Sequence, residues 1–189
     1  MGWDIENRQG HAEAYKDVIH EDKIKVTGSA GTKAPDYAMR IGGTRKFFLE
    51  AKKPAVDLHR DKVPAYQLRR YAWSSKMSLS VLTDFEELAV YDCRIKPHEQ
   101  DKASVARILY LHYTEYIERW EELCGIFCRE SVLKGSFDRY AESNKKKRGT
   151  GEVDTEFLAE IESWRLELAR NLALRNADLS QRDLNFTLL

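Results

Sequence analysis

The chain has 189 residues, of which 42% are hydrophobic and 33% charged, and its 31 basic and 31 acidic side chains leave no net charge. These values suit one domain, or one domain with an appendage, and they argue against indiscriminate nucleic-acid binding, which needs a basic surface. No apolar run reaches the roughly 18 residues that span a bilayer, the sequence begins without a signal-peptide pattern, and the cysteines show no disulfide pattern, so we predict a cytoplasmic protein.

Residues 1–97 predict a mixed α/β domain. Residues 36–41 alternate between polar and apolar side chains, Gly42-Gly43 is a hairpin turn signal, and residues 45–52 form the returning strand. The other elements expected in this part are a strand at 23–27, a loop at 28–33, a helix at 57–77 and two short strands at 79–83 and 88–92.

From about residue 101 the pattern becomes helical. Apolar side chains recur three and four residues apart at Val105, Ile108, Leu109, His112 and Tyr116. Cys124 and Cys128 lie one turn apart on this stretch, and we expect both to be buried and reduced. The sequence therefore predicts an all-helical connector at 98–189.

The connector is expected to contain one long loop. Residues 135–153 are polar and predict that loop, after which Asp154 can cap a helix. The apolar stripe of this helix consists of Phe157, Ile161, Trp164, Leu168 and Leu172. A last short helix is expected after a capping-box pattern at 180–183.

Two acidic side chains are predicted to meet at the end of the hairpin. Asp36 follows a proline at the start of one strand, and Glu50 lies at the end of the returning strand, so the two become cross-strand neighbours. Carboxylates this close need a compensating cation, and Mg²⁺ prefers oxygen ligands such as these. The backbone carbonyl of Ala51 is a third candidate ligand. Lys52 projects from the same face as Glu50, where it can orient water or stabilise a phosphate.

The following helix predicts further side chains for the same site. Gln67 and Tyr71 are four residues apart and share a helix face, so the glutamine can hold a metal-bound water or phosphate and the tyrosine can touch a DNA backbone. The basic residues expected to contact DNA are Lys53, Arg69 and Arg70. The plainer alternatives are an amphipathic helix with Tyr71 packed on the sheet, and a surface ion pair between Glu50 and Lys52.

These motifs resemble a PD-(D/E)XK nuclease, and the Gln-x-x-x-Tyr spacing resembles the RecB-like branch. With Gly2-Trp3-Asp4 and Leu82-Thr83-Asp84-Phe85, they resemble the amino-terminal part of type IIG restriction–modification enzymes. The resemblance implies a restriction-endonuclease-like core with a mixed central sheet, a helical connector, Mg²⁺ as cofactor and double-stranded DNA as substrate. In those enzymes an adenine methyltransferase that uses S-adenosylmethionine follows, and then a target-recognition region.

The chain departs from that pattern in two ways. It contains no methyltransferase or recognition motif, so we expect a partner region or chain to supply both, and we expect this chain to be the front part of a longer protein or a truncated gene product. The family's core also begins with a helix that carries a further acid, and most of that helix is missing here. Glu13 and Glu21 are the two candidates for this acid, and the sequence does not decide between them.

The resulting expectation is a Mg²⁺-dependent DNA endonuclease domain of a restriction–modification system. Two alternatives stay open: a repair or recombination nuclease of the same fold, and a catalytically silent assembly or DNA-binding module. The five histidines have no base–nucleophile companion in the sequence, and residues 28–33 lack the spacing of an ATP-binding loop.

Overall fold

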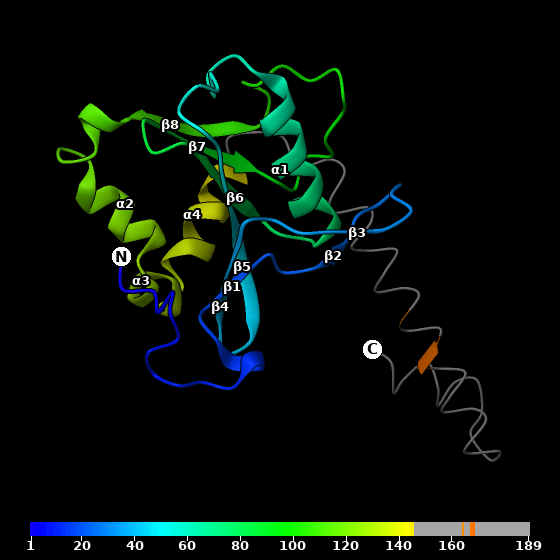
Figure 1. Ribbon diagram of the computed structural model, residues 1–189, viewed down its shortest axis with the longest axis vertical. Coiled ribbons are helices and arrows are strands. Elements are labelled where there is room, and N and C mark those ends of the chain that lie inside the picture. The colour runs from blue at the N-terminus through cyan, green and yellow to red at the C-terminus, as the bar shows by residue number, and fades with distance from the viewer. Residues whose placement is uncertain (146–163, 165–166, 169–189) are drawn as a thin grey trace, which may run out of the picture. The chain divides into compact units, whose positions relative to one another are not determined.

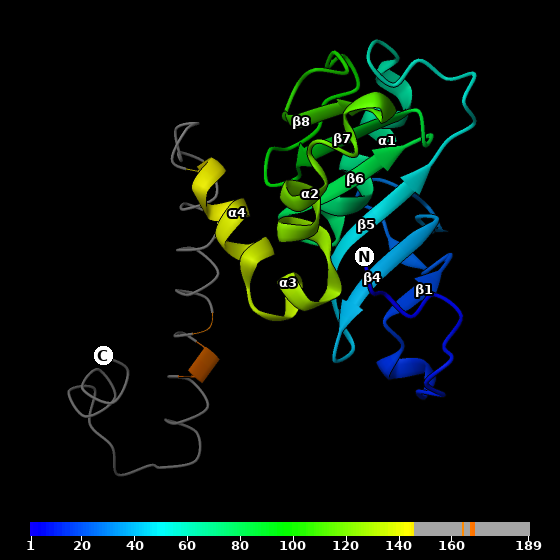
Figure 2. The same cartoon turned by 90° about the vertical axis from the view of Figure 1, so that its left-hand side faces the viewer.

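A mixed sheet of six strands, in the order β1-β4-β5-β6-β7-β8, forms the centre of the computed structural model (Figure 1; Figure 2). The structure describes residues 1–145, 164 and 167–168, and the chain divides into two units, Met1–Lys145 and Lys146–Leu189. The strands of the sheet are β1 (Val18–His20), β4 (Tyr37–Ile41), β5 (Thr44–Ala51), β6 (Leu79–Thr83), β7 (Glu87–Asp92) and β8 (Arg107–His112). The other elements are η1 (Glu13–Tyr15), β2 (Ile24–Lys25), β3 (Thr32–Lys33), α1 (Lys62–Ser74), η2 (Tyr113–Glu115), α2 (Trp120–Phe127), α3 (Arg129–Leu133) and α4 (Ser136–Lys145).

The predicted hairpin is present as β4 and β5. Gly42 and Gly43 both have positive φ, which glycine adopts without the steric cost that a side chain brings. The turn sets the register that pairs Tyr37 with Leu49. A Cβ atom at Gly43 would lie 2.8 Å from the carbonyl oxygen of Ala14, so only glycine fits this close approach.

Helix α1 connects β5 to β6, which are parallel and therefore need a crossover connection. The side chain of Asp61 caps the helix by accepting from the backbone N–H of Val63, and Pro64 lies in the first turn, where proline is tolerated. The predicted helix at 57–77 is therefore confirmed in type, although it begins five residues later because residues 52–61 form the loop that leaves β5.

The two faces of the sheet carry separate apolar clusters. On one face, Leu68 and Ala72 of α1 pack with Ile24 and Val26 from the β2–β3 segment. On the other face, the buried side chains of α2, α3 and α4 pack on Phe47 and its neighbours. Figure 1 shows the sheet close to edge-on, with α1 on one side and α2–α4 on the other. An α/β fold with a mixed sheet is thus confirmed.

The predicted helix through residues 105–116 is wrong, because Arg107–His112 is strand β8. It pairs antiparallel with β7, with Leu88 opposite Leu111 and Val90 opposite Leu109. Both faces of this strand are at least partly covered, so apolar residues follow one another instead of alternating. Their spacing therefore also fits the pattern of an amphipathic helix. The sheet therefore continues beyond residue 97, where we expect the nuclease core to end.

Residues 136–145, expected to be part of a loop, form α4 instead. Phe137 and Ala141 of this helix are buried in the apolar cluster, which stabilises a segment whose own sequence is polar. The helix capped by Asp154, the capping box at 180–183 and the rest of the predicted loop lie outside the described residues. Trp164 and Leu168 of the expected stripe are helical and exposed.

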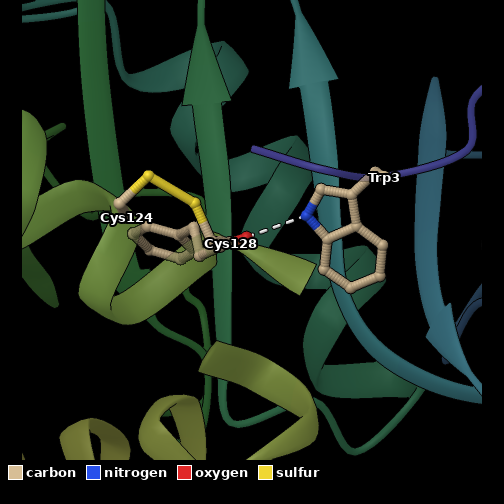
Figure 3. The surroundings of a disulfide bond; sticks show 4 residues. Trp3, Cys124 and Cys128 are labelled. Carbon is tan, nitrogen blue, oxygen red and sulfur yellow. Dashed lines mark hydrogen bonds between the residues drawn. A yellow bond between two sulfur atoms is a disulfide. The ribbon is translucent and has the colours of Figure 1, made fainter. Parts of the chain in front are cut away.

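The structure joins Cys124 and Cys128 by a disulfide (Figure 3), whereas we expected two reduced, buried cysteines. Both are half-buried, and the spacing of four residues places their sulfurs on one side of the chain where α2 ends. The carbonyl oxygen of the intervening Phe127 accepts from Trp3 Nε1 at 2.8 Å, which ties the amino-terminal segment to α2.

Across the described residues, no helix combines the length and the apolar character that a membrane crossing requires.

Candidate active site

The hairpin brings Asp36 and Glu50 together at the end of β5. Asp36 immediately precedes β4, and its backbone N–H donates to Glu50 Oε2 at 3.3 Å. Its carboxylate Oδ2 accepts from the backbone N–H of Ala51 at 2.7 Å. These contacts follow from the register of β4 and β5, which the sequence predicts from the turn at Gly42-Gly43.

Glu50 is a buried carboxyl on which two other predicted side chains converge. It is 2% exposed, and its Oε1 atom accepts from Lys52 Nζ and from Gln67 Nε2, both at 2.7 Å. Burial raises the pKa of Glu50, Lys52 lowers it, and the negative charge of Asp36 raises it again, so that the pKa stays above its usual value. A cation near Asp36 and Glu50 would offset both the lost hydration and the mutual repulsion.

Helix α1 supplies Gln67 and Tyr71 from one face, as their spacing predicts. The Tyr71 hydroxyl lies 3.2 Å from Gln67 Nε2, so the tyrosine helps to fix the amide that contacts Glu50. Tyr71 is half-buried and also packs against the apolar cluster under α1. Tyr71 therefore both packs against the apolar cluster and contacts Gln67.

The three basic residues predicted to contact DNA lie in different surroundings. Lys53 is exposed on the loop after β5. Arg69 is 1% exposed and donates to Asp101 at 2.8 Å, so its guanidinium faces the interior and we leave it out of the DNA-contacting set. Arg70 donates to the carbonyl oxygen of Thr27 at 3.2 Å, across the gap between α1 and the β2–β3 segment.

The structure separates the two candidates for the upstream acid. The backbone N–H of Glu21 donates to the carbonyl oxygen of Asp36 at 3.0 Å, so Glu21 lies at the same end of the sheet as the carboxylate pair. Glu13 belongs to η1 and pairs with Lys16, next to the turn at the opposite end of β4 and β5. Position therefore favours Glu21, which the sequence alone could not distinguish from Glu13.

A cavity of about 500 Å³ opens beside the loop that follows Lys52, and sequence reasoning did not find it. Its acidic lining consists of Asp57, Asp84, Glu86 and Glu87. Glu87 accepts from the backbone N–H of Leu58 at 2.7 Å and from the Tyr110 hydroxyl, so it fixes the loop to the sheet.

The donor set at Asp36 and Glu50 suits a hard cation. Among the described residues, no group of three or more His, Cys, Asp or Glu side chains is placed to hold a metal. A metal here would have two carboxylates and the Ala51 carbonyl, and water and substrate would complete its shell. Mg²⁺ is commonly held by one or two protein carboxylates in this way.

Comparisons with known proteins identify the family of the chain. Residues 4–99 match the family model described as type I restriction enzyme R protein N terminus, and the chain belongs to that family. Over 185 residues, 98% of this chain, it is also 39% identical to the type II restriction enzyme and methyltransferase RM.Eco57I of Escherichia coli. The match covers 18% of that relative. No solved structure matched the chain.

Proposed function

We propose that the chain is a Mg²⁺-dependent DNA endonuclease domain of a restriction–modification system, with a PD-(D/E)XK-type site. The observation that carries this proposal is the convergence of Asp36, Lys52 and Gln67 on the buried carboxyl of Glu50. Membership of a restriction-enzyme family supports the proposal independently of the geometry.

Each side chain has a distinct role in this proposal. Asp36, Glu50 and the Ala51 carbonyl would hold the metal, and a metal held there would lower the pKa of the attacking water and offset charge on the phosphate. Lys52, which lies beside the Glu50 carboxylate, would orient the water or stabilise the phosphate as a point charge. Gln67, steadied by Tyr71, keeps the Glu50 carboxylate in its orientation.

The choice of cutting position belongs to another region. We propose that a methyltransferase and target-recognition region, in the same chain or in a partner chain, selects the site on double-stranded DNA and binds S-adenosylmethionine. The relative is named as both a restriction enzyme and a methyltransferase, and this chain spans only 18% of it. Lys53, Arg70 and Tyr71 are our candidates for contacts with the DNA beside the scissile phosphate.

Plasmid cleavage tests the assignment of Lys52. With Mg²⁺ the wild-type chain should nick or cut supercoiled DNA, and Lys52→Ala should lower the rate about 100-fold or more, the usual cost of losing one charge-stabilising donor. Lys46→Ala is the matched control, because Lys46 lies on the same strand but pairs with Asp138 on the other face of the sheet. Equal cleavage by wild type and Lys52→Ala, with both folded by circular dichroism, contradicts the proposal.

A further inference from the structure

We propose that the short hairpin Lys23–Lys33, which contains β2 and β3, is an arm that contacts the phosphate backbone of DNA through Lys23, Lys25 and Lys33. In this hairpin Ile24 pairs with Lys33 and Lys25 with Thr32. The inference rests on the proposed function, since it assigns to the same site a second set of contacts with its substrate.

The arm is fixed to the face of the sheet that carries the catalytic side chains. Ile24 and Val26, which are 5% and 4% exposed, pack in the same apolar cluster as Leu68 of α1. The backbone N–H of Thr27 donates to Ser74 Oγ at 3.0 Å, at the end of α1. The bond from Arg70 to Thr27 is a further attachment to α1, and Figure 1 shows the hairpin lying beside that helix. An arm held in this way loses little conformational entropy when it binds.

The positive charges of the arm are uncompensated. Lys23, Lys25 and Lys33 are exposed, and none of the three forms an ion pair within the described part of the chain. The neighbouring acid Asp22 is buried and engaged by both Arg45 Nε, at 2.6 Å, and Arg45 Nη2, at 2.8 Å. Free lysines on an otherwise neutral protein concentrate positive charge where a polyanion can bind.

The arm lies within reach of DNA at the catalytic site. Lys33 is three residues before Asp36, and three extended residues span at most about 10 Å. Successive phosphates on one strand of B-DNA advance by about 3.4 Å along the axis. Lys33 would therefore reach phosphates within about three nucleotides of the scissile bond. The antiparallel register places Lys25 opposite Thr32, one residue farther from Asp36, and Lys23 just before the partner of Lys33, at the end of the arm nearer Asp36.

The lysine side chains of the arm indicate which kind of contact it makes with DNA. Its ammonium is a flexible point charge that pairs with phosphate oxygens, whereas base recognition in the major groove commonly uses planar, bidentate side chains. Contacts of this kind position the protein on DNA without reading its sequence. The arm thus suits a nuclease domain whose cutting position is chosen elsewhere.

The salt dependence of DNA binding tests the arm. The full chain is titrated into a fluorescein-labelled duplex of arbitrary sequence, with Ca²⁺ to prevent turnover, over a series of KCl concentrations. Each lost phosphate contact should reduce the slope of log K against log [salt] by about 0.9. Lys25→Gln/Lys33→Gln should reduce it by about 1 to 2. The matched control is Lys46→Gln/Lys134→Gln, which removes two lysines paired with Asp138 and Glu130.

The outcomes separate the two proposals. A smaller slope for Lys25→Gln/Lys33→Gln, with the control equal to wild type, supports the arm. If wild type binds and both double variants keep its slope, the arm is overturned and the proposed function stands. If the folded wild-type chain neither binds nor cuts DNA, the proposed function fails and the arm fails with it. Thermal unfolding of all three proteins verifies that the surface substitutions leave the fold intact.

Discussion

At the scale of single residues, Glu50 connects all the predicted catalytic groups. Its carboxyl is buried, yet it accepts from Lys52 directly after β5, from Gln67 of α1 and from the backbone N–H of Asp36. Burial is the largest cause of its raised pKa, and Asp36 adds to the shift. The ionised form of Glu50 therefore costs stability, and a cation bound beside it would remove this cost.

This cost predicts a pH dependence of stability in the absence of metal. The folded-state pKa of Glu50 lies above its ordinary value of 4.5, so its contribution to stability is fully present below that value and is lost as the pH rises through the folded pKa. Glu50→Gln cannot ionise, so its stability advantage over wild type should increase from about pH 4 to about pH 8. Thermal unfolding of both proteins in EDTA measures this stability difference at each pH. An advantage of Glu50→Gln that shrinks over this range contradicts the raised pKa of Glu50.

At the scale of elements, the site depends on how β4, β5 and α1 are joined. The turn at Gly42-Gly43 fixes the register that places Asp36 against Glu50, and α1 brings Gln67 across from the other side. The buried pair of Arg69 and Asp101 holds α1 against the loop that precedes β8. The Gly42-Gly43 turn, helix α1 and the Arg69–Asp101 pair therefore all help to position side chains at the end of the sheet where Asp36 and Glu50 lie.

Gly43→Ala should destabilise the hairpin and with it the site. The residue has φ of +82°, and an added Cβ atom would lie 2.8 Å from the backbone oxygen of Ala14. The left-handed conformation costs a non-glycine residue about 1–2 kcal/mol, and the close contact adds to this cost. Chemical denaturation should show at least that loss, whereas Gly31→Ala, where a Cβ atom meets open space, should be much milder.

Local signals in the sequence account for part of the fold and for the meeting of Asp36, Glu50, Lys52 and Gln67 at the candidate site. The glycine turn, the strand at 79–83 and the spacing of Gln67 and Tyr71 act over a few residues and were predictable. Strand β8 was missed because its apolar pattern fits either a helix or a buried strand, and only pairing with β7 decides between them. The burial of Arg69 could not be predicted because its partner, Asp101, lies 32 residues away in the sequence. Glu21 could be preferred over Glu13 only once β1 was placed beside β4.

At the scale of the whole molecule, the segment expected to be a connector completes the sheet's second face. Helices α2, α3 and α4 cover the apolar residues of β5, β6 and β7 on that face. The first compact unit of the chain therefore extends to Lys145. The division into a core at 1–97 and a connector at 98–189 stays a prediction about function.

Shortened chains test this extension. A chain that ends at residue 97 lacks β8 and all three helices, so it exposes Phe47, Val81 and Val90 and should fail to unfold cooperatively. A chain that ends at Lys145 keeps the whole cluster and should show a cooperative thermal transition. Circular dichroism and calorimetry measure both, and a stably folded chain of residues 1–97 would refute the role assigned to the helices.

The central claim is that Asp36 and Glu50 form one divalent-metal site, and calorimetric titration with Ca²⁺ tests it most directly. Ca²⁺ takes the same oxygen ligands as Mg²⁺ and can occupy such a site without supporting turnover. The account predicts saturable binding to the wild-type chain and a loss of that binding in both Asp36→Ala and Glu50→Gln, with Glu13→Gln unchanged. No binding by wild type, or equal binding by wild type and Asp36→Ala, would contradict it.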